Sequence, residues 1–527
     1  MRLRHSLICL LILVIPAISC RDDHIIVDEE KTLKSVTVEE EKVVLPYGGT
    51  AEFHFRVKDP LFRFSGLSDL VLSPVTTSGQ FHFISVREDE VVGRYVAVIQ
   101  DIGSRKYNVL TRLGIRQSPG SDALVLSEEF VVSMPGKEGE EEEKPPVDTG
   151  SDLPVVRIKT ENGAPVTSKT VWTKATMLID GVEYDCSIRG RGNSTWSWPK
   201  KPYTIKLDKR ASVLGMPEHK RWVLLANFMD RTLMRNIVAM KVASLTSLAW
   251  TPSCKPVDVV LNGNPIGNYL LIEQVRVDEN RVNIDEKEGF LLELDFHNDN
   301  EIQWVDYHGS CWQRNDGIPF AIKYPEAEDI SPQRIQAIKD YVSEVASVIY
   351  GSGYRDPVNG YAKYIDVQSF IDYWIVFEVM GNHELSNPGS VYMYCDKGGK
   401  LTAGPCWDFD WGVLSYKTSP GARTGLVNRY ALWYARLFSD SNFKAAVKAR
   451  FMQLLPAFQE IPEFMEETEK MLQVSAEQNF MLWNPAQDAN LNGGDIINGD
   501  ERLSFHDACV RLREIFEDRL KVIPNNL

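Results

Sequence analysis

The stretch Arg189–Leu207 reads Arg-Gly-Arg-Gly-Asn-Ser-Thr-Trp-Ser-Trp-Pro-Lys-Lys-Pro-Tyr-Thr-Ile-Lys-Leu, and the rest of the chain is best interpreted outward from it. It begins as a glycine-rich turn whose backbone amides and hydroxyls are of the kind that approach a phosphate. The residues of this turn are Gly190, Gly192, Asn193, Ser194 and Thr195. Because a third glycine is lacking, an ordinary Gly/Asn connection is the alternative.

An alternating strand follows the turn. Tyr203, Ile205 and Leu207 form one apolar face, which places Thr204 and Lys206 on the opposite face. A loop, a strand and then a lysine is the order in which kinases hold nucleotide phosphates. The stretch therefore predicts a phosphate-binding segment.

A second motif, Gly-Pro-Cys-Trp-Asp-Phe-Asp-Trp-Gly over residues 404–412, carries two acids. Asp408 and Asp410 are two residues apart, so on a strand both carboxylates would face the same way. Mg²⁺ in proteins takes one or two carboxylates together with substrate phosphates. The large aromatic residues around the acids favour a packed setting over a solvated turn. We therefore predict a divalent-cation site at Asp408 and Asp410.

The residues upstream of this motif have the order of a kinase catalytic region. Gly-Asn-His-Glu-Leu-Ser-Asn at 381–387 follows a helical pattern and precedes the apolar strand 391–394 and a glycine turn at 397–399. Helix, polar loop, strand, turn, strand and then an Asp-rich motif is the order found around the metal site of kinases. Glu384 is the acid of this loop.

Taken together, the motifs resemble the CotH kinase family, an atypical secreted kinase family named for spore coat protein H. They occur in order over about residues 153–420, and the resemblance is expected to reach the C-terminus. The matching pieces are Arg189-Gly-Arg-Gly-Asn-Ser-Thr-Trp, Pro199-Lys-Lys-Pro-Tyr, Leu214-Gly-Met-Pro, Trp222-Val-Leu-Leu-Ala-Asn, Asp230-Arg-Thr-Leu-Met-Arg-Asn, Leu261-Asn-Gly, Gly267-Asn-Tyr-Leu-Leu-Ile-Glu and Trp407-Asp-Phe-Asp.

This resemblance implies a bilobal, protein-kinase-like α+β domain that transfers the γ-phosphate of ATP to protein serine with Mg²⁺ or Mn²⁺. By motif, Asp408 matches the metal-binding aspartate, with Asp410 beside it. Lys206 would hold the phosphates, with Lys201 and Lys200 as alternatives. The remaining ATP-binding positions implied by the resemblance are Gly190, Gly192, Asn193, Ser194, Lys201 and Glu273, and the implied catalytic residues are Glu384 and Lys206.

The chain departs from the family pattern in several places. Glu384 stands where an aspartate is frequent, and its carboxylate is one methylene further from the backbone. Gly389 or Ser390 stands where an asparagine often gives a second metal contact. The helical stretch near 231–248 has no glutamate to pair with Lys206; it carries Arg231, Arg235 and Asn236 instead. A catalytically inactive surface binding or adhesion protein is therefore the alternative, and glycan binding by the 12 tryptophans is a weaker one.

The first twenty residues predict an exported lipoprotein. Arg2 and Arg4 precede the apolar run Leu7–Ile15, about half the length of a membrane span. Ala17-Ile18-Ser19-Cys20 resembles a bacterial lipobox, in which Cys20 would be lipidated and become the mature N-terminus; ordinary cleavage with a free Cys20 is the alternative. The acidic residues that follow resemble an export tag. We expect an outer-membrane or cell-surface protein that touches the membrane through its lipid anchor only.

The rest of the chain divides by composition and periodicity. After a signal peptide (1–19) and a tether (20–45), period-two patterns over 46–134 predict a small all-β, Ig-like sandwich. The acidic run that ends in Pro145-Pro146 predicts an extended linker over 135–152. The kinase-like domain then takes 153–527, rich in strands first and in helices from 331.

Cap residues and apolar spacing place three helices in that second half. Ser331 and Asp366 are expected to cap two of them, and Ser504 with Asp507 a third. Asp488-Ala-Asn-Leu-Asn-Gly opens like a calcium loop, but its twelfth position is Gly499 instead of a glutamate, which predicts a polar surface loop.

Charge and cysteine content limit the partners. The 527 residues hold 58 Lys+Arg and 73 Asp+Glu, a formal charge of −15, which argues against nucleic acid. The expected partner is a protein substrate, such as a surface or secreted protein. Six cysteines remain besides Cys9 and Cys20; they are too sparse for a disulfide scaffold and lack zinc-site spacing, so disulfides and buried free thiols both stay open.

Overall fold

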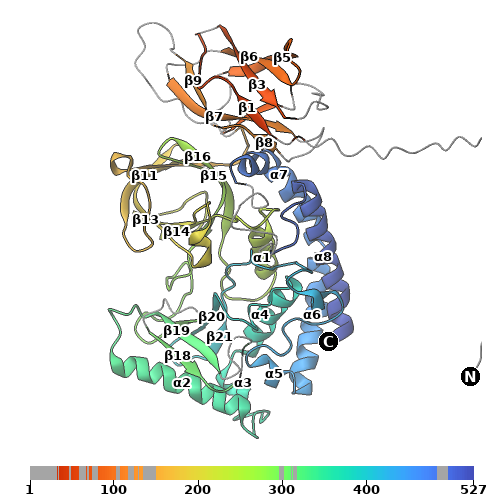
Figure 1. Ribbon diagram of the computed structural model, residues 1–527. Helices are drawn as coiled ribbons and strands as arrows, with labels where there is room; N and C mark the ends of the chain where they lie inside the picture. Colours follow the sequence, from red (N-terminus) through yellow and green to blue (C-terminus); the bar gives the residue numbers. More distant parts are fainter. Residues whose placement is uncertain are drawn as a thin grey trace, which may run out of the picture.

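The computed structural model describes residues 33–134 (without 34, 47–48, 59–66, 68–69, 74–80, 102–106, 117–123 and 129), 150–483 (without 296–301, 310 and 312–316) and 497–527. A pair of β-sheets, a closed barrel and a helical body follow one another from top to bottom in Figure 1. The chain is thus of mixed α+β class, as expected. The leader and Cys20 lie outside the described residues.

Two sheets at the N-terminal end enclose one core. The aromatic residues Phe53, Phe55 and Tyr95 pack against Phe130 and other buried residues of the second sheet. The expected strands near 53–57, 81–83, 95–99 and 107–109 are confirmed. One sheet is β1 (Val36–Val38), β3 (Thr50–Val57), β6 (Arg94–Asp101) and β5 (Phe81–Glu88), and the other is β2 (Lys42–Val44), β9 (Phe130–Met134), β7 (Tyr107–Arg116) and β4 (Leu70–Ser73), with β8 (Leu124–Leu126) on β7.

A closed barrel follows. Its interior is filled by alternating apolar side chains such as Ile188, Ile205, Trp222 and Leu224, as the period-two pattern requires. The outward face of β14 and β16 packs instead on the helical body, through Val223 and its neighbours. The strand order is β10 (Val155–Thr160), β11 (Thr173–Ile179), β12 (Val182–Gly190), β13 (Tyr203–Ala211), β14 (His219–Leu225), β16 (Asn264–Glu273) and β15 (Cys254–Leu261), closed by parallel pairing of β15 with β10.

The helical body is built around one five-stranded sheet. Its strands in order are β18 (Gln303–Asp306), β19 (Ile318–Tyr324), β17 (Phe290–Leu294), β20 (Val391–Cys395) and β21 (Leu401–Ala403). The helices are α1 (Arg235–Ser244), α2 (Pro332–Tyr350), α3 (Tyr361–Tyr364), α4 (Val367–Val379), α5 (Tyr434–Leu437), α6 (Ser441–Phe458), α7 (Ile461–Leu482) and α8 (Phe505–Asn526).

The three expected caps are confirmed. Ser331 accepts a hydrogen bond from the Arg334 amide, and Asp366 accepts one from Ser369. The Ser504 hydroxyl accepts from the amide of Asp507 and donates to its carboxylate. In the part of the chain that the structure describes, no helix is long and apolar enough to cross a membrane.

Helices α7 and α8 run along one side of both the barrel and the helical body in Figure 1. The fully buried ammonium of Lys200, which follows the glycine-rich turn, donates to Asn479 Oδ1 of α7 at 2.7 Å and to the carbonyl of Asn268 in β16. The buried Arg519 of α8 is paired with Glu378 of α4. These contacts fix the barrel and the α4 end relative to one another, and the polar motifs meet between them.

Candidate active site

The glycine-rich turn and the Asp-rich motif, more than 200 residues apart in sequence, lie against each other. The guanidinium of Arg191 is 5.5 Å from the ring centroid of Trp407. Trp198, just beyond the short helix η3 (Ser194–Ser197), stacks on Trp411 with ring centroids 5.8 Å apart and planes 10° apart. The turn therefore contacts the acidic segment on both sides of Asp408 and Asp410.

The expectation that Asp408 and Asp410 share a strand is wrong. Residues 404–410 are irregular, and Asp408 has a φ of +63°, in the left-handed region that ordinary side chains rarely adopt. A backbone turned in this way does not follow the alternation of a strand. Such strained positions often mark functional sites.

The two carboxylates are nevertheless close enough to interact. Burial raises the pKa of Asp410 well above its usual range, and the negative charge of Asp408 raises it further. Burial also raises the pKa of Asp408, while Arg191 opposes this rise and Glu293 adds to it. Arg191 is thus the positive charge that both acids share.

Helix α1 holds the acidic segment in place. The side-chain oxygen of Asn236, fully buried, accepts a hydrogen bond of 2.7 Å from the amide of Phe409, between the two acids. Arg235 Nε donates to the carbonyl of Val413 at 2.8 Å. Arg235 and Asn236 belong to the helical stretch in which the sequence lacks the glutamate of ordinary kinases. In the structure both residues position the acidic segment.

The C-terminal segment from residue 497 onward completes the support. Arg235 is fully buried between Asp230 and Asp500. Asn498 Oδ1 accepts from the Gly412 amide at 2.9 Å, and its Nδ2 donates to the Asp410 carbonyl at 3.1 Å. The stretch Asp488–Gly493 lies outside the described residues, but Asn498, counted with the predicted surface loop, is buried at the site.

Glu384 lies near both acids, in the turn after α4. Its pKa is raised well above the usual range, first by burial and then by the charges of Asp408 and Asp410. Its Oε2 is buried, with no hydrogen-bond partner among the described residues. The Oδ1 of Asn387, in the same turn, is likewise buried and unpartnered within the described chain. Buried oxygens without donors suit a bound cation or a substrate hydroxyl.

Sequence reasoning missed Asn387, although an amide three residues after the acid was visible in the quoted loop. The same applies to Arg191, which was quoted within Arg-Gly-Arg-Gly but assigned no role. A long cation placed between two glycines of a turn is the signal that would have identified it.

A strand of the central sheet adds a further acid nearby. Glu293 of β17 accepts a hydrogen bond of 2.7 Å from the hydroxyl of Tyr392 and is 3.0 Å from the ammonium of Lys323. Its charge acts on Asp408 and is therefore part of the same electrostatic environment. The positive charges in this environment include Arg191, Arg235, which also acts on Asp410, and Lys323 beside Glu293.

The predicted lysines lie elsewhere. Lys206 is exposed on β13, opposite Ser187 and Arg221 in the neighbouring strands. Lys201 donates to the backbone carbonyl of Trp196 at 2.7 Å. Lys200 is buried against α7, and this burial lowers its pKa well below the usual range.

The other predicted nucleotide contacts are structural in this arrangement. Glu273, fully buried, is paired with Arg281 and accepts from the amide of Ser253 at 2.8 Å. A Cβ on Gly190 would lie 2.2 Å from the ring of Trp196, so only glycine fits there. Gly192, at a φ of +87°, also has no room for a side chain beside Thr195. Asn193 and Ser194 are exposed at the start of η3.

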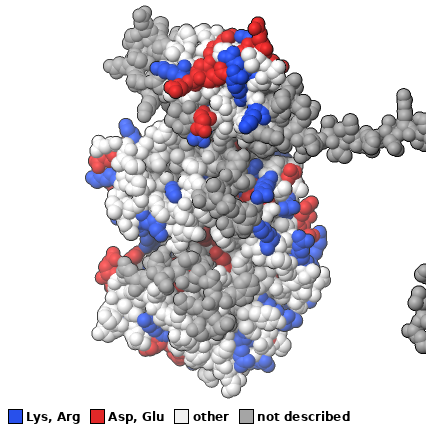
Figure 2. Space-filling model, viewed as in Figure 1, with Lys and Arg blue, Asp and Glu red and all other residues white. Residues whose placement is uncertain are grey.

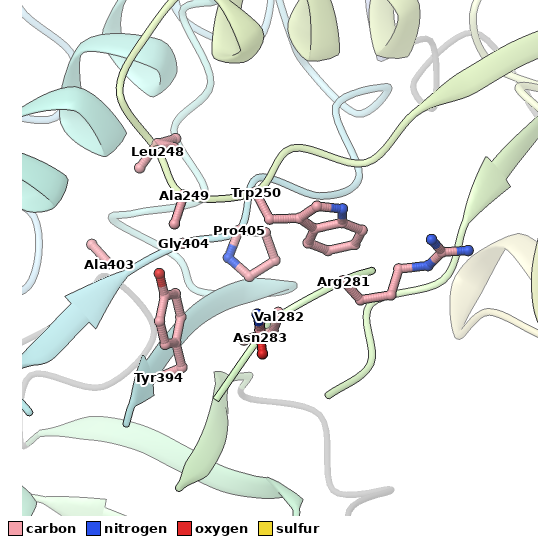
Figure 3. A pocket seen from close by; sticks show the side chains of 10 residues that line it. All are labelled: Leu248, Ala249, Trp250, Arg281, Val282, Asn283, Tyr394, Ala403, Gly404 and Pro405. Atoms are coloured by element: carbon pink, nitrogen blue, oxygen red, sulfur yellow. The ribbon is translucent and has the colours of Figure 1, made fainter. Parts of the chain in front are cut away.

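A small cavity of about 60 Å³ lies beside the segment that leads to Asp408. Figure 3 shows Trp250, Arg281, Tyr394 and Pro405 around it, with Leu248, Ala249, Val282, Asn283, Ala403 and Gly404 as the other lining residues. Small-molecule sites usually measure roughly 300 Å³ or more. The cavity as it stands is therefore too small for a nucleotide.

Whether a metal fits is a matter of donor chemistry. Within the described ranges, no group of three or more His, Cys, Asp or Glu side chains is arranged to hold a metal ion by itself. A pair of carboxylates with orphaned oxygens nearby suits Mg²⁺ or Mn²⁺, because such ions take their remaining ligands from water and substrate phosphates. Asp408, Asp410 and the Glu384 turn fit that incomplete kind of site.

A family model described as CotH kinase protein matches residues 188–523. No curated protein is found to match. Among solved structures, the surface layer protein SbsC (domains 4–9) is similar at 12% identity over 46% of this chain and 31% of that chain; its TM-score of 0.14 carries no argument.

Proposed function

The chain belongs to the CotH kinase protein family, and from that premise we propose that it is an atypical kinase that transfers the γ-phosphate of ATP to serine of a protein substrate. The observation that carries the proposal is the convergence of Arg191, Asp408 and Asp410 with the Glu384 turn. Phosphoryl transfer relies mainly on positioning and on neutralising phosphate charge, and this set offers both a fixed cation and metal-binding acids.

Each residue of the set has a role in this proposal. Asp408 and Asp410 would hold Mg²⁺ or Mn²⁺, with the Asn387 amide oxygen as a further ligand. A divalent ion bound there would neutralise charge on the β- and γ-phosphates. Arg191, instead of Lys206, is the phosphate-binding side chain, because it shares the environment of both acids. Its planar guanidinium matches two phosphate oxygens at once.

Glu384 is the group that would accept the proton of the substrate serine while the serine oxygen bonds to the γ-phosphorus, the bond from that phosphorus to the β–γ bridging oxygen breaks, and ADP leaves. The raised pKa of Glu384 makes its carboxylate a stronger base than an exposed one. A divalent ion bound at Asp408 and Asp410 would favour the ionised form of the Glu384 carboxylate, because opposite charges attract.

The setting of the reaction is part of the proposal. We place the barrel and the helical body as the two lobes of a kinase-like domain. The two N-terminal sheets are an Ig-like spacer, carried by a tether from a lipidated Cys20. The protein would thus work outside the cytoplasm, at the outer membrane or cell surface, on a surface or secreted protein.

The test is transfer of labelled γ-phosphate from ATP by the purified protein, with Mg²⁺ or Mn²⁺, to itself and to a generic protein acceptor. Asp408→Asn and Arg191→Gln should each reduce the amount of transferred label by a factor of about 100 or more. Each variant removes a side-chain charge that would stabilise the transition state, directly or through the bound metal ion. Lys206→Gln is the matched control and should keep most of the activity. Full activity of Asp408→Asn would refute the assignment.

The alternative, an inactive kinase-like binding protein, is favoured by the glutamate at 384 and by the lysines that lie away from the acids. An inactive binder should show neither label transfer nor a metal-dependent rise of melting temperature with ATP. If neither label transfer nor the rise of melting temperature is observed, the hypothesis of an inactive binding protein is favoured.

A further inference from the structure

A second group of cations lies on the outward face of the barrel, away from the residues assigned above. We name Trp172, Arg189, Arg221 and Arg276 the Trp172 cluster. The guanidinium carbons of Arg189 and Arg221 lie 4.6 and 4.9 Å from the ring centroid of Trp172. Arg276 follows β16 and joins the cluster electrostatically, since its charge acts on both other arginines.

The three arginines are crowded and incompletely paired. Burial, together with repulsion from Arg276 and Arg189, lowers the pKa of Arg221 to about 10. Buried nitrogens of all three (Arg189 Nε, Arg221 Nη1 and Arg276 Nε) have no hydrogen-bond partner among the described residues. Positive charges held close together with unused donors are costly unless an anion binds them.

One carboxylate already shows what the cluster accepts. Glu326, which follows β19 of the helical body, is paired with Arg276 and also attenuates the pKa shifts of Arg189 and Arg221. Three guanidiniums therefore share one carboxylate in the described part of the chain. The guanidinium groups of Arg189 and Arg221 therefore have hydrogen-bond donors left over, and these donors suit further carboxylates.

The cluster is distinct from the proposed phosphate end of the site. The charge of Arg191 acts on Asp408, whereas Arg189 interacts with Arg276 and Glu326. Val171, beside Trp172, is 65% exposed, so an extended chain can approach the cluster from solvent. On the face drawn in Figure 2, blue and red side chains are interspersed over the described surface.

We propose that the Trp172 cluster binds an acidic segment of the protein substrate, in which glutamate or aspartate side chains flank the accepting serine. This inference rests on the proposed kinase function and adds the substrate class. The carboxylates would pair with Arg189 and Arg221 in the way that Glu326 pairs with Arg276. The protein carries a net negative charge, which repels an acidic peptide from the rest of the surface. Binding of such a peptide would therefore depend on the Trp172 cluster.

The test measures binding directly, so that it does not depend on catalysis. A fluorescein-labelled peptide with one serine followed by four glutamates is titrated with the purified protein, and anisotropy is recorded at low and at moderate ionic strength. A peptide with glutamine in place of each glutamate is the reference. The glutamate peptide should bind more tightly, and its binding should weaken with salt.

Variants decide whether the cluster is responsible. Arg189→Gln and Arg221→Gln should each weaken binding of the glutamate peptide by roughly tenfold or more, since each removes charge-assisted hydrogen bonds. Lys209→Gln, an exposed cation on β13, should leave binding unchanged. A melting curve checks that each variant is folded; if the half-buried Arg221 variant is not, Arg189→Gln decides alone.

Competition separates this proposal from the one it rests on. ATP with Mg²⁺ should not displace the peptide, and Asp408→Asn should bind it normally even if no phosphate transfer is ever seen. The proposal is overturned if both peptides bind equally or if the arginine variants bind normally. It is also overturned if ATP displaces the peptide and Arg221→Gln weakens a labelled ATP analogue instead, because the cluster would then belong to the nucleotide.

Discussion

At the scale of single residues, the site depends on buried amides as much as on charged groups. Asp408 adopts a left-handed conformation that ordinary residues avoid, and the buried Asn236 holds the next amide along the chain. The side-chain nitrogen of Asn236, Nδ2, donates to Asn227 Oδ1 at 3.1 Å. Backbone strain at a residue persists when its surroundings over-determine the conformation in this way.

Asn236→Ala should therefore cost about 1–3 kcal/mol of unfolding free energy, because the buried Phe409 amide loses its acceptor. It should also lower phosphate transfer by displacing Asp408. Urea unfolding and the transfer assay measure the two effects. Asn359→Ala, an exposed control on the α2–α3 connection, should change neither. A stable and fully active Asn236→Ala would contradict the positioning role.

A pH effect follows from His219 on β14, whose Nδ1 accepts from the Arg221 amide at 2.8 Å. Burial, aided by the charge of Arg281, lowers its pKa to about 4. In the unfolded chain the imidazole of His219 takes up a proton near pH 6.5, whereas in the folded protein it does so only near pH 4. The free energy of unfolding is therefore highest above pH 6.5 and falls by about 2–3 kcal/mol as the pH drops towards 4.

Urea unfolding at a series of pH values tests this effect in wild type and in His219→Gln. The wild type should lose more stability between pH values of about 6.5 and 4 than the variant, because glutamine does not titrate. Parallel pH profiles for the two proteins would show that the imidazole contributes nothing in this range.

At the scale of elements, helix α1 and the segment before α8 act together as a clamp on the acidic motif. Arg235 connects Asp230, Asp500 and the Val413 carbonyl while fully buried. Two carboxylates around one guanidinium compensate its burial, and removing one of them leaves charge uncompensated.

Asp500→Ala should accordingly lower the unfolding free energy by about 3–5 kcal/mol and weaken ATP-dependent thermal stabilisation. Asp208→Ala, an exposed acid on β13, is the matched control and should change stability by less than about 0.5 kcal/mol. Denaturant titration gives both values. Equal unfolding free energies of the two variants would show that the ion pair between Arg235 and Asp500 does not stabilise the fold.

At the scale of the whole molecule, the N-terminal sheets have a core of their own. The described residues of that core all lie between Leu33 and Val132, and none belongs to the barrel or the helical body. Contact with the rest includes Arg116, 3.8 Å from Glu477 of α7. Units that share little buried surface unfold separately.

Calorimetry of the full chain should therefore show two unfolding transitions. A chain that starts at Gly150 should keep the transition of the barrel and helical body, together with any phosphate transfer. It retains Ser151, whose hydroxyl donates to Asp258 in β15. A large loss of melting temperature in the shorter chain would show that the sheets support the rest of the fold.

Local signals in the sequence were enough for the family and for several of the strands and helices. The caps at Ser331, Asp366 and Ser504 and the alternation of β3 and β13 depend on neighbours a few residues away, so they can be derived without tertiary structure. The order of the motifs identified the family, which the match over 188–523 supports. The family likeness also drew attention to Lys206, a choice that spacing alone could not test.

Tertiary packing decided which groups meet. Nothing in local periodicity relates Arg191 to Asp408, or Asn498 to Asp410, because these pairs depend on how the barrel, α1 and the last segments pack around a common core. Burial likewise made Lys200 a structural contact of α7. The sequence by itself determined the elements and the residue types; long-range packing determined their partners, their burial and hence their chemistry.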